Sequence, residues 1–478
     1  MTLQKTEETT CDICVIGGGS AGLSVAAGAS QMGADTILVE RGEMGGDCLN
    51  SGCVPSKSLL AAAKAARSGA KAAAFGIAYD PPRIDFEAVQ AHVQQVIAGI
   101  APHDSVERFE GLGVRVLRDS ASFHSPHELV VGEQRIRARR FVLATGSRAL
   151  VPPVSGLAET PYLTNESIFA LKDCPDHLIV LGGGPIGCEL GQAFRRLGAR
   201  VSLVEMNRLL PREDRQAAEL LRERLQAEGV EIHENAGMSA VQKTHDGIQA
   251  QLKTERGEAT LEGSHLLVAT GRQPVTDGLN LEAAEVIHDS RGIKVDARLR
   301  TSNRRIFAAG DVAGGPQFTH AASYQAGIIL RNALFRLPAR VNYAALPRVT
   351  YCTPELAQVG LTVEEAQQQG KKVEILQSTF AENDRARCEH ATDGFIKIVA
   401  TRSGAVLGAT IIGPQAGELI LPWGLAIARR MKLSALAGII APYPTLSEIS
   451  KQVAGSHYTP KLFSSRTRWL VRLLLRLG

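Results

Sequence analysis

The sequence predicts an α/β protein with two Rossmann-like dinucleotide-binding domains, followed by a C-terminal α+β domain. Three observations support this fold class. A strand, a glycine-rich loop, a helix and a second strand follow one another between residues 11 and 40, and the same series returns between residues 177 and 205. From about residue 346 the pattern changes to alternating strands, with helices at 363–369 and 416–432. The repeat indicates an internal duplication of a nucleotide-binding unit.

The first unit begins with the apolar strand Cys11–Ile16, which runs into the loop GGGSAG. An alanine-rich helix follows at 21–32, and a second strand, Thr36–Val39, ends at Glu40. The loop matches G-x-G-x-x-G with Gly17, Gly19 and Gly22. Such glycines permit a tight turn and the close approach of a pyrophosphate to the helix N-terminus, while the acid accepts hydrogen bonds from a ribose. We therefore expect a bound dinucleotide here.

The second unit has the strand LIVL, the loop GGGPIG, a helix and the strand VSLVE, which ends at Glu205. Its loop glycines are Gly182, Gly184 and Gly187. In both units the acid follows the first glycine by 23 residues. Two units imply two dinucleotides, as hydride transfer between a nicotinamide and a flavin requires. A carboxylate suits the free 2′-hydroxyl of NAD(H) and repels the 2′-phosphate of NADP(H), so we expect a preference for NADH, although Arg208 lies close by.

Between and after these units, residues 58–115 have a helical pattern and residues 116–131 a strand-like one. Two sister stretches, FVLATGS at 141–147 and LLVATGR at 266–272, each end in a turn. A further strand and turn is expected at 303–312.

Composition limits the function. Of the 478 residues, 44% are hydrophobic, which indicates a substantial core. The net charge of +4 is too small to indicate nucleic acid as a partner. The first ten residues are polar, and no run approaches the roughly 20 apolar residues of a membrane span. We therefore expect a cytoplasmic protein. Its eight cysteines should then be reduced, so a close pair of them favours catalysis over a structural bridge.

The most informative stretch is GGDCLNSGCVPSK at residues 45–57, which contains Cys48 and Cys53. From these residues alone the pair is a structural bridge, a metal clip or a reagent. The stretch resembles the pyridine nucleotide–disulfide oxidoreductases, the flavoprotein family of dihydrolipoamide dehydrogenase, glutathione reductase and mercuric reductase. The likeness runs from Cys14 to about Glu448, with the motifs in the family's order. It makes the pair a reagent, because a thiolate is the reactive form in exchange through a mixed disulfide.

The resemblance implies FAD and NAD(P) as cofactors, and a homodimer whose active sites lie at the subunit boundary. It also implies the domains. We expect an FAD-binding domain in two parts, an NAD(P)-binding domain, a dimer-interface domain and a tail, at residues 1–155 and 273–345, 156–272, 346–460 and 461–478 respectively.

The resemblance also assigns roles to single residues. Cys48 corresponds to the interchange thiol that meets the substrate, and Cys53 to the thiol that faces the flavin. Lys57 corresponds to the family lysine near the flavin N5, with Glu189 as its partner. Asp311 corresponds to the residue that binds the ribityl chain of the flavin. The turns near the nucleotides contain Thr145, Gly146, Thr270 and Gly271.

The sequence departs from the family's disulfide reductases at one catalytic position. They carry a histidine five residues before a glutamate, supplied by the partner subunit; here the glutamate is Glu448 and Tyr443 replaces the histidine. A phenol is a poor base at neutral pH. Mercuric reductases have tyrosine here too, yet this sequence lacks their C-terminal cysteine pair, and His320 is closer to dihydrolipoamide dehydrogenase. The substrate class is thus a small-molecule disulfide, or alternatively a thiol-bound metal or metalloid; no resident metal is expected.

The tail at 461–478 places Arg468, Arg472 and Arg476 at i, i+4 and i+8, with tryptophan and leucines around the rest of the helix. This basic stripe on an apolar body is typical of a helix that lies on anionic lipid. A terminal helix docked on the dimer fits equally well. The lipid interpretation adds an alternative function: a membrane-associated electron-transfer flavoprotein.

Overall fold

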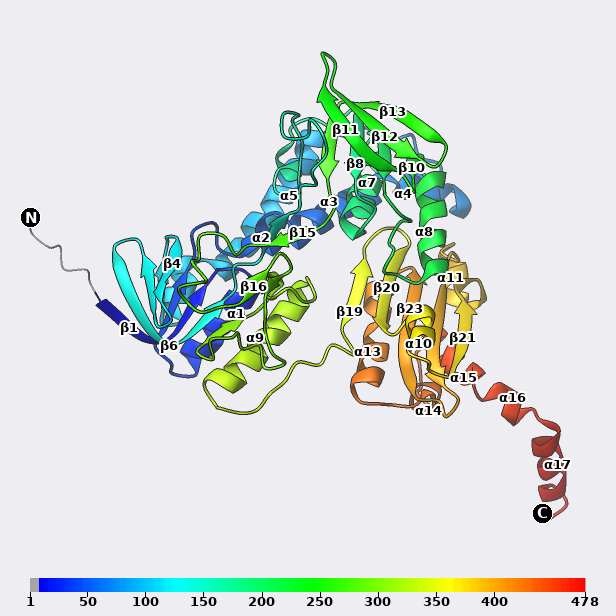
Figure 1. Ribbon diagram of the computed structural model, residues 1–478. Coiled ribbons are helices and arrows are strands. Elements are labelled where there is room, and N and C mark those ends of the chain that lie inside the picture. The colour runs from blue at the N-terminus through cyan, green and yellow to red at the C-terminus, as the bar shows by residue number, and fades with distance from the viewer. Residues whose placement is uncertain (1–7, 478) are drawn as a thin grey trace, which may run out of the picture.

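The computed structural model describes residues 8–477. The first seven residues of the predicted segment 1–155 and Gly478 of the tail lie outside the described residues. Three lobes make up the molecule, each built on its own sheet, and the C-terminal helices project beyond the third lobe (Figure 1). The predicted fold class is confirmed, because two lobes contain the expected parallel βαβ units and the third is α+β.

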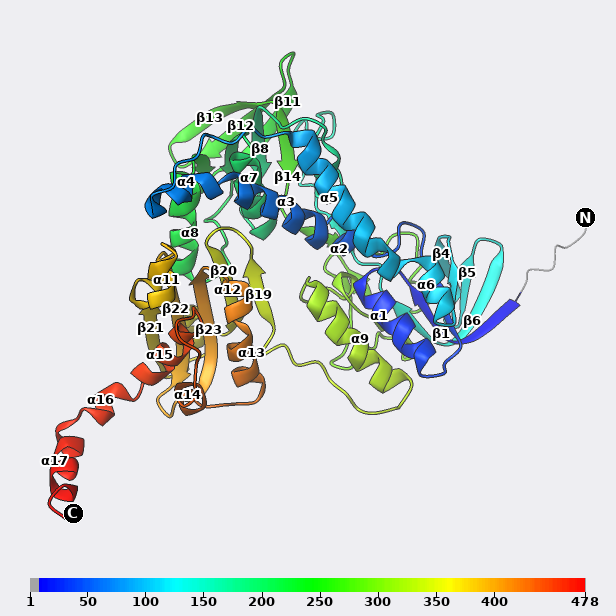
Figure 2. The same ribbon diagram turned by 180° about the vertical axis from the view of Figure 1, so that it is seen from behind.

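The first lobe contains a sheet of order β3-β2-β1-β6-β5-β4, in which β18 pairs with the C-terminal end of β6, at residues 141–143. Strands β3, β2, β1, β6 and β18 run parallel, while β5 is antiparallel to both of its neighbours, β6 and β4. Strand β1 is apolar because both of its faces are covered, as expected for a parallel sheet. Helices α1 (Ser20–Gln31) and α9 (Thr319–Ala333) pack side by side on one face (Figures 1 and 2). The strands are β1 Glu8–Ile16, β2 Thr36–Val39, β3 Val114–Leu117, β4 Ala121–Ser125, β5 Glu128–Val131, β6 Gln134–Leu143 and β18 Ile306–Ala308.

The region expected to be helical at 58–115 contains helices with one irregular interruption. The thiol-bearing helix begins earlier than expected, at Cys53, and residues 77–85 form neither helix nor strand. Pro81 and Pro82 explain this break, since proline lacks the amide that a helix needs. The elements here are α2 Gly46–Asn50, α3 Cys53–Ala66, α4 Ser68–Ala72, η1 Ala73–Phe75, α5 Phe86–Ile100, η2 Ala101–Asp104 and α6 Val106–Gly111.

The second lobe has a parallel sheet of order β10-β9-β8-β14 and a separate antiparallel sheet, β11-β12-β13. Its glycine loop follows β8 and starts α7, as the first loop follows β1 and starts α1. Short pairs, β7 with β15 and β16 with β17, complete the connections. The elements are β7 Ser147–Ala149, η3 Ile168–Ala170, β8 His177–Leu181, α7 Pro185–Arg196, β9 Arg200–Val204, α8 Arg215–Ala227, β10 Val230–His233, β11 Gly237–Lys243, β12 Ile248–Thr254, β13 Gly257–Gly263, β14 His265–Val268 and β15 Arg272–Pro274. Three later elements, β16 His288–Asp289, β17 Gly292–Ile293 and η4 Asp311–Ala313, belong to the first lobe, where Ile293 and Val312 pack in one core with Phe141 of β6.

The third lobe is an antiparallel sheet of order β19-β20-β23-β22-β21. The helix expected at 416–432 is two helices that meet at Ile420, and it ends early, at Ala428. Pro422 lies in the first turn of the second helix, where its missing amide costs nothing. The elements are β19 Pro347–Thr350, β20 Glu355–Gly360, α10 Val363–Gln368, β21 Val373–Thr379, η5 Phe380–Glu382, α11 Asp384–Cys388, β22 Phe395–Thr401, β23 Val406–Gly413, α12 Ala416–Leu419, α13 Leu421–Ala428, α14 Leu433–Ala437, α15 Glu448–Ser456, α16 Thr459–Leu462 and α17 Ser465–Leu474.

Helix α3 connects the first two lobes. Its apolar face, with Leu59 and Ala63, lies in one core with Phe194 of α7. Because α3 starts at Cys53 and α7 starts at the second glycine loop, this packing holds the thiol pair between the two nucleotide loops. The residue limits of the five predicted segments stay a prediction.

Candidate active site

A cavity of about 1590 Å³ runs between the two glycine loops. Fifteen of the predicted catalytic and cofactor-binding residues line it, and most of these come from the two βαβ units and from α2 and α3. They are Gly17, Gly19, Glu40, Cys48, Cys53, Lys57, Thr145, Gly146, Gly182, Gly184, Glu189, Glu205, Thr270, Gly271 and Asp311. Gly22 and Gly187 lie in the first turns of α1 and α7, where they contact the loop backbone and do not line the cavity. Tyr443 and Glu448 belong to the third lobe.

The first loop is shaped by close backbone contacts. A Cβ on Gly22 would lie 1.8 Å from the carbonyl oxygen of Gly17, so helix α1 can approach the loop only without a side chain there. Gly17 itself has φ +110°, which favours glycine. At Gly19 the nearest atom to such a Cβ is 3.9 Å away, so this glycine leaves space on the cavity side. The carboxylate of Glu40 accepts hydrogen bonds from the amides of Gly18 and Gly42.

The second loop repeats this construction. A Cβ on Gly187 would lie 1.9 Å from the carbonyl oxygen of Gly182, whereas one on Gly184 would meet nothing within 4 Å. Glu205 accepts hydrogen bonds from the amides of Gly183 at 2.7 Å and Asn207 at 2.9 Å. Both loops therefore present a helix N-terminus, open space and a fixed carboxylate, which fits one dinucleotide in each.

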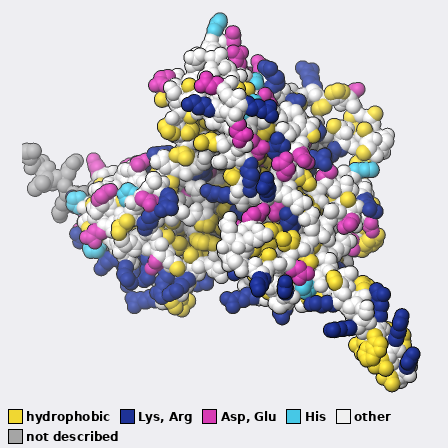
Figure 3. Space-filling view, turned by 45° about the vertical axis from the view of Figure 1, so that its right-hand side comes forward, with side chains coloured by type: hydrophobic (Ala, Val, Ile, Leu, Met, Phe, Trp, Pro, Cys, Tyr) yellow, Lys and Arg dark blue, Asp and Glu magenta, His cyan; other side chains and the backbone are white. Residues whose placement is uncertain are grey.

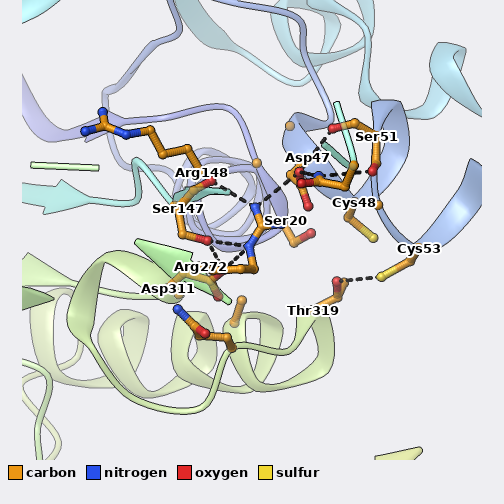
Figure 4. A pocket seen from close by; sticks show the side chains of 18 of the residues that line it. Ser20, Asp47, Cys48, Ser51, Cys53, Ser147, Arg148, Arg272, Asp311 and Thr319 are labelled. Carbon is orange, nitrogen blue, oxygen red and sulfur yellow. Dashed lines mark hydrogen bonds and ion pairs between the residues drawn. The ribbon is translucent and has the colours of Figure 1, made fainter. Parts of the chain in front are cut away.

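The two thiols have different acidities. Their mutual interaction, with burial, raises the pKa of Cys48, and the same interaction lowers the pKa of Cys53 to about 6. Thr319, whose Oγ1 lies 3.5 Å from the Cys53 sulfur, and the charge of Lys57 also lower the pKa of Cys53 (Figure 4). The negative charge of the reduced pair therefore resides on Cys53, at the first residue of α3, and the proton resides on Cys48.

Lys57 and Glu189 form an ion pair with 2.8 Å between Nζ and Oε2. It joins α3 to α7. Burial on its own would lower the pKa of Lys57, but the charge of Glu189 and their hydrogen bond outweigh it and raise this pKa. Tyr351 holds both partners: its amide donates to Glu189 at 2.8 Å, and its ring centroid lies 4.5 Å from the Lys57 ammonium. Lys57 is thus a fixed cation beside Cys53.

Replacing this cation tests its effect on the thiol. In Lys57→Met, the pKa of Cys53 should rise above about 6, by about one unit, because a nearby opposite charge favours the thiolate. Titration of the NADH-reduced, FAD-loaded protein, followed through the thiolate–flavin absorption band, should show a midpoint displaced to higher pH. Lys64→Met, an exposed lysine on the same helix, should leave the midpoint in place. An unchanged midpoint in Lys57→Met would show that the lysine does not act on this thiol.

A polar network that the sequence analysis did not identify lies beside the thiols. Arg272 lies between Asp47 and Asp311, at 3.2 and 3.6 Å from their carboxylates, and donates to the Ser147 hydroxyl at 2.7 Å (Figure 4). Ser147 in turn donates to Asp311. Burial raises the pKa of Asp311, and Ser147 and Arg272 counteract this. Ser147 and Arg272 could have been found from the sequence, because each ends one of the two sister stretches. Nothing in the sequence singles out Thr319 or Tyr351.

Tyr443 and Glu448 do not line the cavity. Tyr443 is 72% exposed, and its hydroxyl donates to Asp384 at 3.2 Å. That hydrogen bond, and the charge of Asp384, raise the pKa of Tyr443. Glu448 begins α15 and is half-buried. His320 does line the cavity, where its ring bonds to the Pro347 carbonyl at 2.9 Å. Supply of Tyr443 and Glu448 by a partner subunit stays a prediction.

Two nucleotide cradles, joined by a cavity that also holds a thiol pair of unequal acidity, define a nucleotide-dependent oxidoreductase. Family models agree. Residues 11–326 match pyridine nucleotide-disulphide oxidoreductase, and residues 346–454 match the dimerisation domain of the same enzymes. The chain belongs to this family of FAD-dependent flavoproteins, which use a pyridine nucleotide and act on sulfur groups.

Curated relatives carry two different names. The chain is 35% identical over 455 residues to a mercuric reductase of Streptomyces lividans, covering 93% of this chain and 96% of that protein. It is 36% identical over 450 residues to a dihydrolipoyl dehydrogenase of Thermus scotoductus, covering 92% and 95%. Both activities occur at similar distance from this chain, so the family is shown and the substrate is not.

Solved structures show the same architecture. The HOCl-induced flavoprotein disulfide reductase RclA from Escherichia coli, in its Cu(II) complex, is 28% identical with a TM-score of 0.83, and the alignment covers 92% of this chain and 99% of that one. LpdA from Mycobacterium tuberculosis is 28% identical with a TM-score of 0.85, over 94% and 99%. The predicted family resemblance is therefore confirmed.

Proposed function

We propose that the protein is an NADH-dependent homodimeric reductase that passes electrons through FAD and a Cys48–Cys53 disulfide to a disulfide or thiol-bound substrate. One observation carries this proposal: a low-pKa thiol, Cys53, lies beside the fixed cation of Lys57 in the cavity that joins both nucleotide cradles. Bound FAD would supply the relay of two electrons between NADH and the thiol pair. The first cradle, with Glu40 and Asp311, would hold FAD, and the second, with Glu205, would hold NADH.

The thiols then complete the reaction by exchange. Cys48 attacks one sulfur of the substrate disulfide and forms a mixed disulfide; the S–S bond of the substrate breaks, and the departing thiolate takes up the proton that Cys48 loses. The Cys53 thiolate attacks the Cys48 sulfur next, which restores the Cys48–Cys53 disulfide and releases the second substrate sulfur as a thiolate that takes a proton from solvent. Two electrons thereby pass from the pair to the substrate, and the thiol pair would regain them from the bound cofactors.

Proton handling favours disulfide reduction over dithiol oxidation. Oxidation of a dithiol requires a base that removes protons from the substrate. Tyr443 is no such base, because its bond to Asp384 raises its pKa and keeps the phenol protonated at neutral pH. A protonated phenol can instead give a proton to a departing thiolate. In the proposed homodimer, Tyr443 and Glu448 would face the substrate side of the partner's Cys48.

Anaerobic titration with NADH tests the proposal. The purified FAD-loaded protein should develop a long-wavelength thiolate–flavin band, and it should be reoxidised rapidly by one of lipoamide, glutathione disulfide or Hg²⁺. Reoxidation by Hg²⁺ alone would establish the alternative, reduction of a thiol-bound metal, which Tyr443 and the mercuric reductase relatives favour. Reduction of the flavin without the band would contradict the thiol mechanism and favour simple electron transfer.

Restoring the family base gives a second test. Tyr443→His should raise the rate of dihydrolipoamide oxidation by at least about tenfold, part of the 10²–10⁴-fold that a well-placed general base contributes. The gain should disappear below the pKa of the new imidazole. Steady-state rates between pH 5 and 9 measure it. The exposed Tyr79 provides a matched control, since Tyr79→His should change nothing. Equal rates in wild type and Tyr443→His would place Tyr443 outside the site.

Nucleotide preference depends on Glu205. Both carboxylate oxygens are fixed by backbone amides toward the cavity, and Arg208 donates to the carbonyls of Pro211 and Glu213. Glu205→Gln keeps the shape and removes the charge, so the ratio of kcat/KM for NADH over NADPH should fall by about tenfold or more, because opposed like charges cost several kcal/mol. A ratio that stays constant would mean that Glu205 does not select the nucleotide.

A further inference from the structure

Helix α17 (Ser465–Leu474) stands clear of the rest of the molecule (Figures 1 and 2). None of its residues is buried, and the family models end before it, at residue 454. Its large apolar side chains are exposed: Trp469, Leu470, Val471, Leu473 and Leu474, with Leu475 and Leu477 after them. Residues 8–477 therefore give this apolar surface no partner within one chain.

Three of the four arginines in residues 461–478 lie on one narrow stripe, while Arg466, in the first turn of α17, lies outside it. Arg468, Arg472 and Arg476 recur every fourth residue, so they lie on one face, and the apolar residues fill most of the remaining circumference. Ser464 caps the helix by accepting the amide of Thr467 at 3.2 Å. Figure 3 shows this apolar surface bordered by Lys and Arg side chains. Arginine stems can lie along an apolar surface while their charges stay in the polar layer.

Charge is distributed unevenly along the chain. Residues 449–478 contain six Lys or Arg and no Asp or Glu. Of the 53 basic and 49 acidic residues in the chain, 47 and 49 then remain in residues 1–448. The end of the chain thus carries +6 while everything before it carries −2. A helix that only packs on its own dimer has no need of this concentration, whereas an anionic lipid surface attracts it.

A second surface of the same character follows α9. Phe335 and Leu337 are 54% and 52% exposed on either side of Arg336. Burial lowers the pKa of Arg140, and the nearby charges of Arg305, Arg139 and Arg336 lower it further. The segment after α9 forms the lower edge of the first lobe in the view of Figure 1, the same side toward which α17 extends. Basic and apolar groups thus occur together at two places on one side.

We propose that α17 docks the protein on a membrane surface rich in anionic lipid, with its apolar face among the lipid headgroups and its arginine stripe against the phosphates. Among residues 8–477, no helix is long and apolar enough to cross a membrane, so the helix would lie on the surface. The segment after α9 would provide a second, weaker contact, since stable attachment usually takes two signals.

Sedimentation with vesicles tests the proposal. The full-length FAD-loaded protein should sediment with phosphatidylcholine vesicles that contain phosphatidylglycerol, and much less with phosphatidylcholine alone. Replacing Arg468, Arg472 and Arg476 together with glutamine should weaken the binding at least about tenfold, because each basic residue near the surface contributes. Leu470→Asn with Leu473→Asn should weaken it as well. Reduction of the flavin by NADH should be unchanged in both variants.

A matched control removes the same charge elsewhere. Lys243, Lys253 and Arg256 lie exposed in the β11–β13 sheet, and their replacement by glutamine should leave vesicle binding intact. Equal losses in the control would reduce the effect to net charge and overturn the proposal. Wild-type protein that ignores anionic vesicles, together with tail variants that become monomers in light scattering, would overturn it too and assign α17 to the subunit interface.

Discussion

Cys53→Ser should abolish disulfide turnover while leaving NADH able to reduce the flavin. A hydroxyl cannot form the disulfide, and removing one member of a catalytic unit removes nearly all of what the unit contributes, so we expect a loss of at least about 10³-fold. The thiolate–flavin band should vanish as well, because the charge of the reduced pair resides on Cys53, whose pKa is lowered to about 6. Anaerobic titration and steady-state assays measure both effects.

Cys48→Ser separates the two thiols. It should abolish turnover to the same degree and yet retain the band, because the thiolate of Cys53 remains beside Lys57. Cys174→Ser is the control: this half-buried thiol bonds to the Leu197 carbonyl at 3.6 Å, a hydrogen bond that a hydroxyl can replace, and it lies outside the cavity lining. Turnover that survives in Cys53→Ser, or a band that vanishes in Cys48→Ser, would contradict the assigned roles.

Local patterns were sufficient to predict the fold. A glycine loop after an apolar strand can be recognised because its requirements are local: Gly22 must let α1 approach the backbone of Gly17, and Gly187 does the same at Gly182. The break at residues 77–85 is harder to predict, because the sequences on both sides have high helical propensity and only Pro81 and Pro82 mark the break. The split at Ile420 was missed for a related reason, since Pro422 is compatible with a helix start as well as with a helix end.

The site could be predicted only in part. Residues in recognisable motifs, such as Cys48, Lys57 and Asp311, do line one cavity. Thr319 and Tyr351 belong to no recognisable motif, and only the folded chain brings them to the site. Thr319 begins α9, 266 residues after Cys53 in the sequence, yet its hydroxyl contacts the Cys53 sulfur. The pKa of each thiol could not be predicted from the sequence either. It depends on the contact between the two thiols and on the charge of Lys57, which α3 places beside Cys53.

The second cradle allows nicotinamide binding to be removed while the flavin stays. In Gly187→Ala the new Cβ would lie 1.9 Å from the carbonyl oxygen of Gly182, so the loop and helix α7 must separate. Because a displacement of about 1 Å can cost about 10²-fold in rate, we expect kcat/KM for NADH to fall at least that much. Flavin content should stay at the wild-type level, since this loop belongs to the second sheet. Rapid-reaction measurement of flavin reduction gives the rate.

The duplicated unit supplies its own comparison. Gly22→Ala makes the equivalent clash, 1.8 Å from the carbonyl oxygen of Gly17, in the cradle assigned to FAD, so the protein should be purified largely without flavin. Gly99→Ala, at an exposed helix position where a Cβ meets nothing within 4 Å, should alter neither property. If Gly187→Ala lost flavin and Gly22→Ala lost only its reaction with NADH, the assignment of the two cradles would have to be exchanged. If both variants lost flavin equally, the clash would act on the folding of the whole chain, which would contradict the separate roles of the two cradles.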